Sequence, residues 1–158
     1  MERSWKIIFT WANVALSGVA AQSSLWNPLY LPSLVIDVFF FFFYGYKSCT
    51  STLIEDDPWW RVDMLEPYDI STIVIIRRTD CCASELNGAE IRIGDSLENN
   101  GTNNPRCAII TVTSNAVMNF HCSQMRGRYV IILLPGSNRR LQLCEVKVYA
   151  ASNITGAD

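Results

Sequence analysis

Residues 70–76 read Ile-Ser-Thr-Ile-Val-Ile-Ile, and this stretch decides the fold. Successive side chains of a β-strand point to opposite faces of the sheet, and here both faces are largely apolar. A strand of this kind is buried on both sides, as in the core of a β-sandwich. The stretch therefore predicts a central strand at 70–76.

Short stretches of alternating polar and apolar residues continue on the C-terminal side of this strand. We predict further strands at 90–93, 107–112, 128–134 and 141–149. Turn signals such as Asn87-Gly88 and Pro135-Gly136 separate these strands. No stretch keeps a helical period long enough to predict a helix in place of the strands. The sequence therefore predicts an all-β sandwich or jelly roll, with Trp59 and the apolar faces of 70–76 and 129–133 in one core.

The chain has 158 residues, which suits one well-buried domain. We predict this domain at 13–150, with an N-terminal segment at 1–12 and a C-terminal tail at 151–158. The N-terminal segment has the character of an incomplete signal region, because its basic start leads into an apolar stretch that polar residues interrupt. The other apolar run, at 34–46, is shorter than the ~20 residues of a membrane-spanning helix.

The formal net charge is −2, and basic and acidic residues are intermixed along the chain. The sequence offers no basic face for a phosphate backbone and no polybasic membrane patch, so nucleic acid is not an expected partner. His121 beside Cys122 would suggest a base and a nucleophile. No motif places an acidic partner for them, and we therefore do not expect an enzyme.

Six cysteines form an even set that lacks the spacing of a zinc site. Three disulfides in a secreted protein are the favoured interpretation. Cys81 and Cys82 are adjacent, and two interpretations remain open for them. One is a strained disulfide ring that presents a stiff apolar knob to a ligand, and the other is two unrelated thiols, one buried and one free. Glycosylation sequons at Asn100 and Asn153 also fit a secreted protein.

The last predicted strand changes phase. Leu141 and Leu143 have one parity and Val146 has the other, so the inward face switches between them. A β-bulge would restore the phase and would turn the Cys144 carbonyl and the Glu145 side chain toward a cation. The alternative is a short strand that leaves Val146 exposed.

Motifs spread over nearly the whole chain resemble one family. They are Asn-Val-Ala-Leu at 13–16, Ala-Gln-Ser at 21–23, Pro-Trp-Trp-Arg-Val-Asp at 58–63, Arg-Thr-Asp-Cys-Cys at 78–82, Asn-Gly-Ala-Glu-Ile at 87–91, Asn-Asn-Pro-Arg-Cys at 103–107, Gly-Arg-Tyr-Val at 127–130 and Leu-Cys-Glu-Val at 143–146. Together they resemble the F-type lectins, or fucolectins, over residues 13–149. The resemblance implies a discoidin-like (F5/8 type C-like) β-sandwich jelly roll, a bound calcium ion and recognition of terminal L-fucose, without catalysis.

The resemblance also implies how the cysteines pair. By position it joins Cys49 to Cys144, Cys107 to Cys122 and Cys81 to Cys82. The implied function is an extracellular carbohydrate-binding module. Its expected partners are fucosylated or related glycans, and a homo-oligomer is a further expectation.

The sugar-binding positions implied by the resemblance are Arg78, Cys81, Cys82, Ser51 and Glu85. Arg78 and the two cysteines match the family, whereas Ser51 stands in place of a histidine and Glu85 in place of a second arginine. Hydrogen bonds to charged groups contribute ~1.5–3 kcal/mol each, so the two lost donors correspond to about 3–6 kcal/mol. This is roughly a hundredfold to ten-thousandfold loss in affinity, and we expect a weakened or altered sugar specificity.

The calcium positions implied by the resemblance are Leu34, Asp37, Phe39, Ser48, Cys144 and Glu145. Three of them keep the family residue, and the other three act in the family through backbone carbonyls, which any residue supplies. Val38 replaces a family glycine and restricts the dihedral angles of the loop. We therefore expect calcium as the cofactor of a partly degenerate site.

Residues 39–43 are five consecutive phenylalanines, where the family has polar residues. Three interpretations remain open: extra core, an exposed patch for a membrane or a protein partner, or translated non-coding sequence from a pyrimidine-rich tract. The second interpretation gives the alternative function, a discoidin-like adhesion module that binds protein or lipid through this hydrophobic loop.

Overall fold

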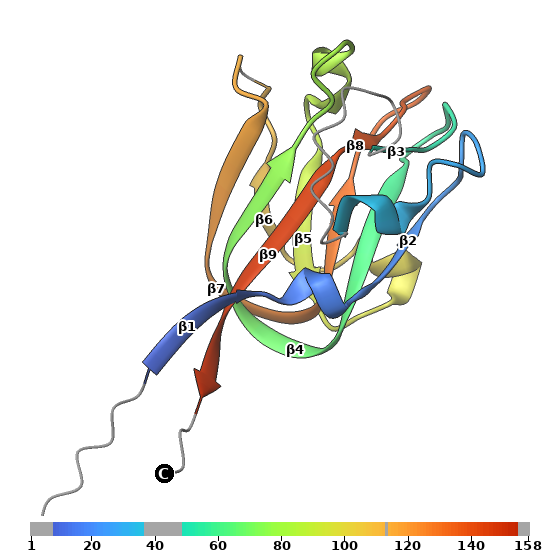
Figure 1. Ribbon diagram of the computed structural model, residues 1–158. Coiled ribbons are helices and arrows are strands. Elements are labelled where there is room, and N and C mark those ends of the chain that lie inside the picture. Colours follow the sequence, from blue (N-terminus) through green and yellow to red (C-terminus); the bar gives the residue numbers. More distant parts are fainter. Residues whose placement is uncertain (1–7, 37–48, 113, 155–158) are drawn as a thin grey trace, which may run out of the picture.

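A computed structural model describes residues 8–36, 49–112 and 114–154 of the chain (Figure 1). The strands are β1 (Ile8–Asn13), β2 (Val19–Gln22), β3 (Thr50–Ser51), β4 (Trp59–Ile76), β5 (Glu90–Gly94), β6 (Arg106–Ile109), β7 (Val117–Leu133), β8 (Gln142–Leu143) and β9 (Glu145–Ile154). Short 3-10 segments are η1 (Val14–Ser17), η2 (Pro32–Ile36), η4 (Ala83–Leu86) and η5 (Glu98–Gly101). Within the described ranges there is no α-helix, and no helix is long and apolar enough to cross a membrane. The all-β prediction is confirmed.

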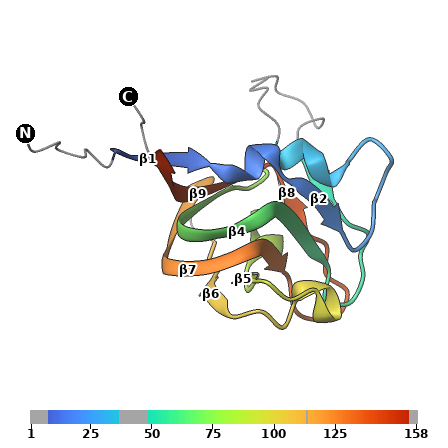
Figure 2. The ribbon, with the colours of Figure 1, turned by 90° about the horizontal axis from the view of Figure 1, so that it is seen from below.

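The strands form two antiparallel sheets. The larger has seven strands in the order β1-β9-β4-β7-β5-β6, with β2 also paired to β4, and β3 pairs with β8 in a small second sheet. β4 and β7 are long, and their shared register shifts at two places, one of them between Asp63 and Tyr68. Pro67 lacks an amide hydrogen and Leu65 has a φ of 72°, so the chain bends there. Seen from below, β4 and β7 curve round the molecule and turn the sheet into a roll (Figure 2).

The first and last strands lie side by side. β1 pairs with β9 from Ile8 opposite Ile154 to Asn13 opposite Tyr149. The sheet therefore includes residues on both sides of the predicted 13–150 boundaries.

Apolar side chains from both halves of the roll meet in one core. The largest fully buried side chains are Trp60, Ile70, Ile73, Ile75, Ile91, Ile93, Ile110, Ile131, Ile132, Leu134, Leu141 and Leu143. The predicted contributions of 70–76 and 129–133 are confirmed, since both stretches supply members of this set.

The prediction that Trp59 belongs to the core is wrong, because the buried tryptophan is Trp60. Trp60 is 0% exposed, and its indole Nε1 donates a hydrogen bond to the Pro32 carbonyl over 3.0 Å. Trp59 is only half-buried, and the guanidinium carbon of Arg61 lies 4.9 Å from the centre of its ring. Residues alternate along β4, so an inward Trp60 turns Trp59 and Arg61 outward.

All three predicted disulfides are present. They join Cys49 to Cys144, Cys81 to Cys82 and Cys107 to Cys122. The first ties the start of β3 to the residue between β8 and β9, and the third ties β6 to β7. The interpretation of Cys81 and Cys82 as unrelated thiols is therefore wrong.

The phase change in the last predicted strand occurs at a break between two strands. β8 ends at Leu143 and β9 begins at Glu145, and the Cys144 amide between them donates to the Ile76 carbonyl over 2.9 Å. Leu143 and Val146 are both buried, so the alternative with an exposed Val146 is wrong. The predicted bulge is also absent, because the two stretches belong to different sheets and need no common phase.

Candidate sugar-binding site

Arg78 lies two residues after the end of β4, and hydrogen bonds to Asp80 and Gln142 hold its side chain in place. Its Nε and Nη2 atoms donate to the two carboxylate oxygens of Asp80, at 2.6 and 2.9 Å, in a fork-to-fork arrangement. Its Nη1 atom donates to Oε1 of Gln142 over 2.9 Å. The guanidinium is therefore held rigidly between a carboxylate and an amide, with its side chain 22% exposed.

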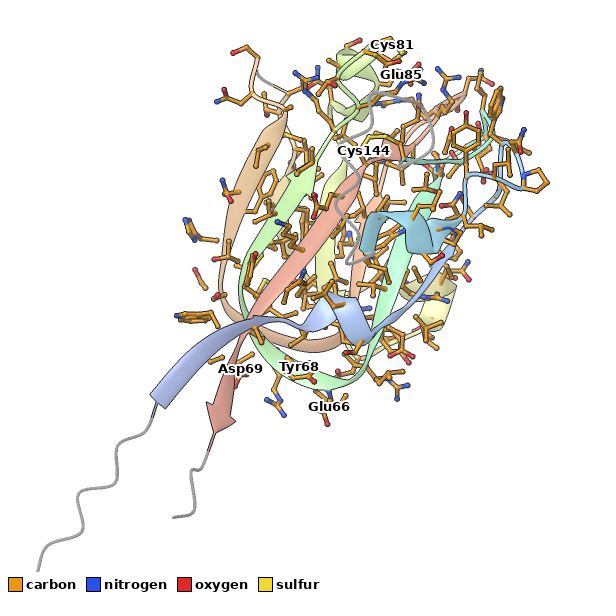
Figure 3. The ribbon with its side chains drawn as sticks, in the orientation of Figure 1. Glu66, Tyr68, Asp69, Cys81, Glu85 and Cys144 are labelled. Carbon is orange, nitrogen blue, oxygen red and sulfur yellow. A yellow bond between two sulfur atoms is a disulfide. The ribbon has the colours of Figure 1, made fainter. Side chains whose placement is uncertain are left out.

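The Cys81–Cys82 ring determines where Glu85 lies. Cys82 has a φ of 66°, and this left-handed residue turns the chain into η4. Its carbonyl accepts a hydrogen bond from the Glu85 amide over 3.1 Å. Cys81 is exposed, and Figure 3 shows it close to Glu85 at the top of the molecule, with Cys144 below them.

Glu85 is bonded to two side chains from the β8 region, and it remains partly exposed. Its Oε1 accepts from Nη2 of Arg140 over 2.8 Å. Its Oε2 accepts from Nε2 of Gln142 over 2.8 Å and from Nε of Arg140 over 3.3 Å. The position where the family resemblance expects an arginine thus holds a carboxylate that is paired with an arginine from elsewhere in the chain.

Gln142 joins these groups into one unit. Its amide oxygen accepts from Arg78 and its amide nitrogen donates to Glu85, so both ends of the amide are used. The connected side chains are Asp80, Arg78, Gln142, Glu85 and Arg140, which we call the Gln142 network. It contains two positive and two negative charges, and it presents hydrogen-bond donors and acceptors side by side.

Sequence reasoning missed Gln142 and Arg140. The available signal for Gln142 was a single polar residue between Leu141 and Leu143, which are both buried. A buried polar side chain needs partners, and this one finds them in Arg78 and Glu85. Nothing in the sequence around Arg140 distinguishes it from other surface arginines.

Ser51 lies on the opposite strand from Gln142. The two are direct register partners in the β3–β8 pair, so their side chains lie on the same face of that sheet. Ser51 is 5% exposed, and its hydroxyl donates to the Thr52 carbonyl over 3.1 Å. The structure thus brings Ser51, Arg78, Glu85 and the disulfide ring around Gln142, but it turns the serine hydroxyl toward the backbone.

An apolar rim lies on two loops beside β3. Its exposed members are Leu25, Trp26, Leu29, Leu31, Leu53 and Ile54. The Trp26 amide donates to the Ser51 carbonyl over 3.0 Å, and the Leu53 amide donates to the Ser24 hydroxyl over 2.9 Å. These bonds hold the two loops of the rim together beside β3.

The predicted calcium positions are only partly within the described residues. Asp37, Phe39 and Ser48 lie outside them, as does the phenylalanine run at 39–43. Leu34 lies in η2, which packs against β9, the strand that begins at Glu145. The Glu145 carboxylate lies 3.5 Å from Nζ of Lys147.

Few acidic or sulfur ligands lie among the predicted calcium positions that the structure describes, which are Leu34, Cys144 and Glu145. In the described ranges no group of three or more His, Cys, Asp or Glu side chains is arranged to hold a metal ion. Cys144 is bonded to Cys49 and offers only its carbonyl. Among the predicted positions that are described, Glu145 has a carboxylate and Leu34 and Cys144 have backbone carbonyls, and oxygen ligands of this kind suit calcium better than a softer metal.

His121 and Cys122 do not form a catalytic pair. Cys122 is bonded to Cys107, so it has no thiol to act as a nucleophile. His121 is exposed, and its Nδ1 lies 3.3 Å from the Thr72 hydroxyl. This contact links two neighbouring strands, β4 and β7.

Comparisons with known proteins agree with this fold. A family model described as NedA-like, galactose-binding domain, of the F5/F8 type C group, matches residues 44–132. Fucolectin-5 of Anguilla japonica is 45% identical over 148 residues, which cover 90% of this chain and 78% of that protein. Several other fucolectins of the same eel are similar at 41–47% identity.

Solved structures give the same result. The serum F-lectin (fucolectin) of the striped bass Morone saxatilis superimposes on 92% of this chain with a TM-score of 0.84 and 43% identity. The matched part is half of that lectin's chain. A fucose binding module of Streptococcus pneumoniae, SpX-3, superimposes with a TM-score of 0.74 at 26% identity over 88% of this chain and 98% of its own. With the eel relatives similar over most of its length and the same roll in its solved neighbours, this chain belongs to the fucolectin, or F-type lectin, family.

Proposed function

We propose that the chain is an extracellular lectin module that binds fucosylated or related glycans at the Gln142 network. The observation that carries this proposal is Arg78, which Asp80 and Gln142 hold rigidly next to the Cys81–Cys82 ring. Relatives named fucolectins and a solved fucose binding module support the choice of sugar. Three disulfides are in keeping with an extracellular protein, as are the serum origin and name of the striped bass lectin.

The network has the chemistry that a sugar needs. Each sugar hydroxyl both donates and accepts hydrogen bonds, and the network offers guanidinium donors beside carboxylate acceptors. The disulfide between Cys81, which is exposed, and Cys82 adds an apolar surface that suits the methyl group of a deoxy-sugar. Because the ring is closed, this surface loses no side-chain entropy when a ligand packs on it.

The specificity is expected to differ from that of a site with two arginines and a histidine. Glu85 accepts where an arginine would donate, and Arg140 approaches it from the other side. Ser51 is too short and too buried to replace a histidine. We propose that Glu85 and Arg140 together contact neighbouring hydroxyls, and that free L-fucose binds weakly.

A panel of immobilised glycans tests the lectin function. Secreted protein is offered matched glycans with and without terminal L-fucose, together with liposomes of neutral and anionic lipids. We expect preferential retention on the fucosylated members. Equal retention on all glycans, or none on any, would contradict the proposal.

The adhesion module is the second candidate function. The loop predicted for it, at 39–43, lies outside the described residues, and the apolar rim at Leu25–Leu31 and Leu53–Ile54 favours it instead. Six large apolar side chains are exposed there within two loops that hydrogen bonds connect. Exposed apolar groups gathered in this way are typical of interaction surfaces. Retention on liposomes in the same panel, without preference among glycans, would support this function instead.

Calcium is the proposed cofactor, held by backbone carbonyls near Leu34 and Cys144 and by the carboxylate of Glu145. A bound ion stabilises the folded state by about 2.7 kcal/mol at a hundredfold excess over its Kd. We therefore expect added calcium to raise the thermal unfolding midpoint of the wild type. The change Glu145→Gln is expected to remove most of this rise, and Glu98→Gln in η5 is the matched control. A wild-type midpoint that ignores calcium would count against the site.

A further inference from the structure

The segment after β5 forms a tightly bent tip. Asn99, Asn100 and Gly101 have consecutive positive φ values of 49°, 60° and 88°. Asparagine and glycine tolerate this left-handed conformation better than other residues. A side chain at Gly101 would approach Ile131 to 3.0 Å, so the glycine also allows the tip to lie close to the sheet.

Hydrogen bonds hold the tip from several sides. The Asn100 carbonyl accepts from Nη1 of Arg61 over 2.9 Å, and the Thr102 hydroxyl donates to the Asn99 carbonyl over 2.7 Å. Asn104, which is 4% exposed, donates to the Gly101 carbonyl over 3.0 Å. The backbone of the tip is therefore well ordered.

The side chain of Asn100 is left available. It is exposed, and no hydrogen bond joins its amide to any residue in the described part of the chain. Gly101 and Thr102 follow it, so a hydroxyl residue lies two positions along. This is the acceptor pattern for attachment of an N-linked glycan.

Asn100 is one of the residues that line a hollow on the surface. The volume of this hollow is about 460 Å³, and it is lined by Asp57, Trp59, Asn99, Asn100, Thr102 and Leu133. Trp59 brings the flat apolar surface on which the C–H face of a sugar ring packs, and its neighbours bring a carboxylate and amides for the hydroxyls. The Trp59 ring already contacts the Arg61 guanidinium, and it remains partly exposed beside the hollow.

We propose that Asn100 carries an N-linked glycan whose first sugar rings pack in this hollow against Trp59. The donor is an oligosaccharide attached through its anomeric carbon to a lipid diphosphate. The amide nitrogen of Asn100 forms a bond to that carbon, and the bond from the carbon to the diphosphate oxygen breaks. The lipid diphosphate leaves with the electron pair, and the amide nitrogen gives up one proton.

The glycan would leave the Gln142 network open. η4 precedes β5 and η5 follows it, and Figure 1 shows η4 at the top of the molecule and η5 at the lower right. A glycan at Asn100 therefore covers the outer face near Trp59 and not the candidate sugar-binding site. Its presence can be tested without reference to what the lectin binds.

Glycopeptide mass spectrometry of protein secreted from animal cells tests the attachment. We expect the peptide with Asn100 to carry a glycan, which peptide-N-glycosidase removes with conversion of the residue to aspartate. Thr102→Ala is expected to abolish the modification, and Thr102→Ser, which keeps the hydroxyl, to retain it. An unmodified Asn100 in the folded, secreted wild type would overturn the proposal, whatever the variants do.

Thermal unfolding tests the packing against Trp59. Enzymatic removal of the glycan is expected to lower the unfolding midpoint of the wild type by a measurable amount. The same treatment of a Trp59→Ala variant is expected to leave its midpoint unchanged, because the apolar surface is already gone. An equal drop in both proteins would show that the glycan does not pack in the hollow.

Discussion

Replacement of both Cys49 and Cys144 by alanine is expected to lower the free energy of unfolding by about 4–5 kcal/mol. The bridge connects residues 95 positions apart, so it constrains most of the unfolded chain. It also ties the start of β3 to the break between β8 and β9, which is where the small sheet beneath the Gln142 network is built. Urea unfolding under non-oxidising and non-reducing conditions measures the loss.

The second long-range disulfide provides the matched control. Cys107 and Cys122 are 15 positions apart, so their replacement by alanine is expected to cost about 3 kcal/mol, less than the longer bridge. Both double variants remove the same atoms. If the two losses were equal, or if the shorter loop lost more, loop closure would not be the main contribution of these bridges.

The triple change Ser51→His, Glu85→Arg and Arg140→Glu is expected to strengthen L-fucose binding by about a hundredfold, or ~2.7 kcal/mol. It restores the two charged donors that the family resemblance expects. The third change keeps an ion pair between positions 85 and 140 with its direction reversed, so the new arginine is oriented by a carboxylate. Titration calorimetry with L-fucose measures the gain.

The double change without Arg140→Glu is the informative comparison. It places a new guanidinium at position 85 beside Arg140, whose Nη2 atom in the wild type donates to Glu85 over 2.8 Å. Like charges at this separation repel, and Gln142 loses the acceptor for its amide nitrogen. We expect a gain of only about tenfold for the double variant. No gain in the triple variant would show that positions 51 and 85 do not limit the affinity.

The fold was predictable because its signals are local. Apolar residues on both faces of 70–76 indicated a buried strand, and β4 contains that stretch. The choice between Trp59 and Trp60 was not local, since it depends on which parity of β4 faces the core across a bend near Leu65. The same holds for the end of the chain, where Leu143 and Val146 face inward in two different sheets.

The candidate site was predictable only through its resemblance to a family. Motif positions indicated Arg78, the cysteine ring, Ser51 and Glu85, and the structure brings them together. The partners of Glu85 come from β8 and the residues before it, more than fifty positions later in the chain, and no spacing rule connects them. Their roles in sugar binding, like the calcium positions, remain predictions.

The central claim is that a sugar binds beside Arg78, and titration calorimetry of three proteins with the glycan that the wild type retains best in the immobilised panel tests it most directly. Arg126→Ala is the matched control, because Arg126 is an exposed arginine paired with Asp69, which Figure 3 shows at the opposite end of the molecule from Cys81. We predict that Arg78→Ala weakens binding at least tenfold relative to the wild type, whereas Arg126→Ala leaves it unchanged. Equal affinity of the wild type and Arg78→Ala would contradict the account.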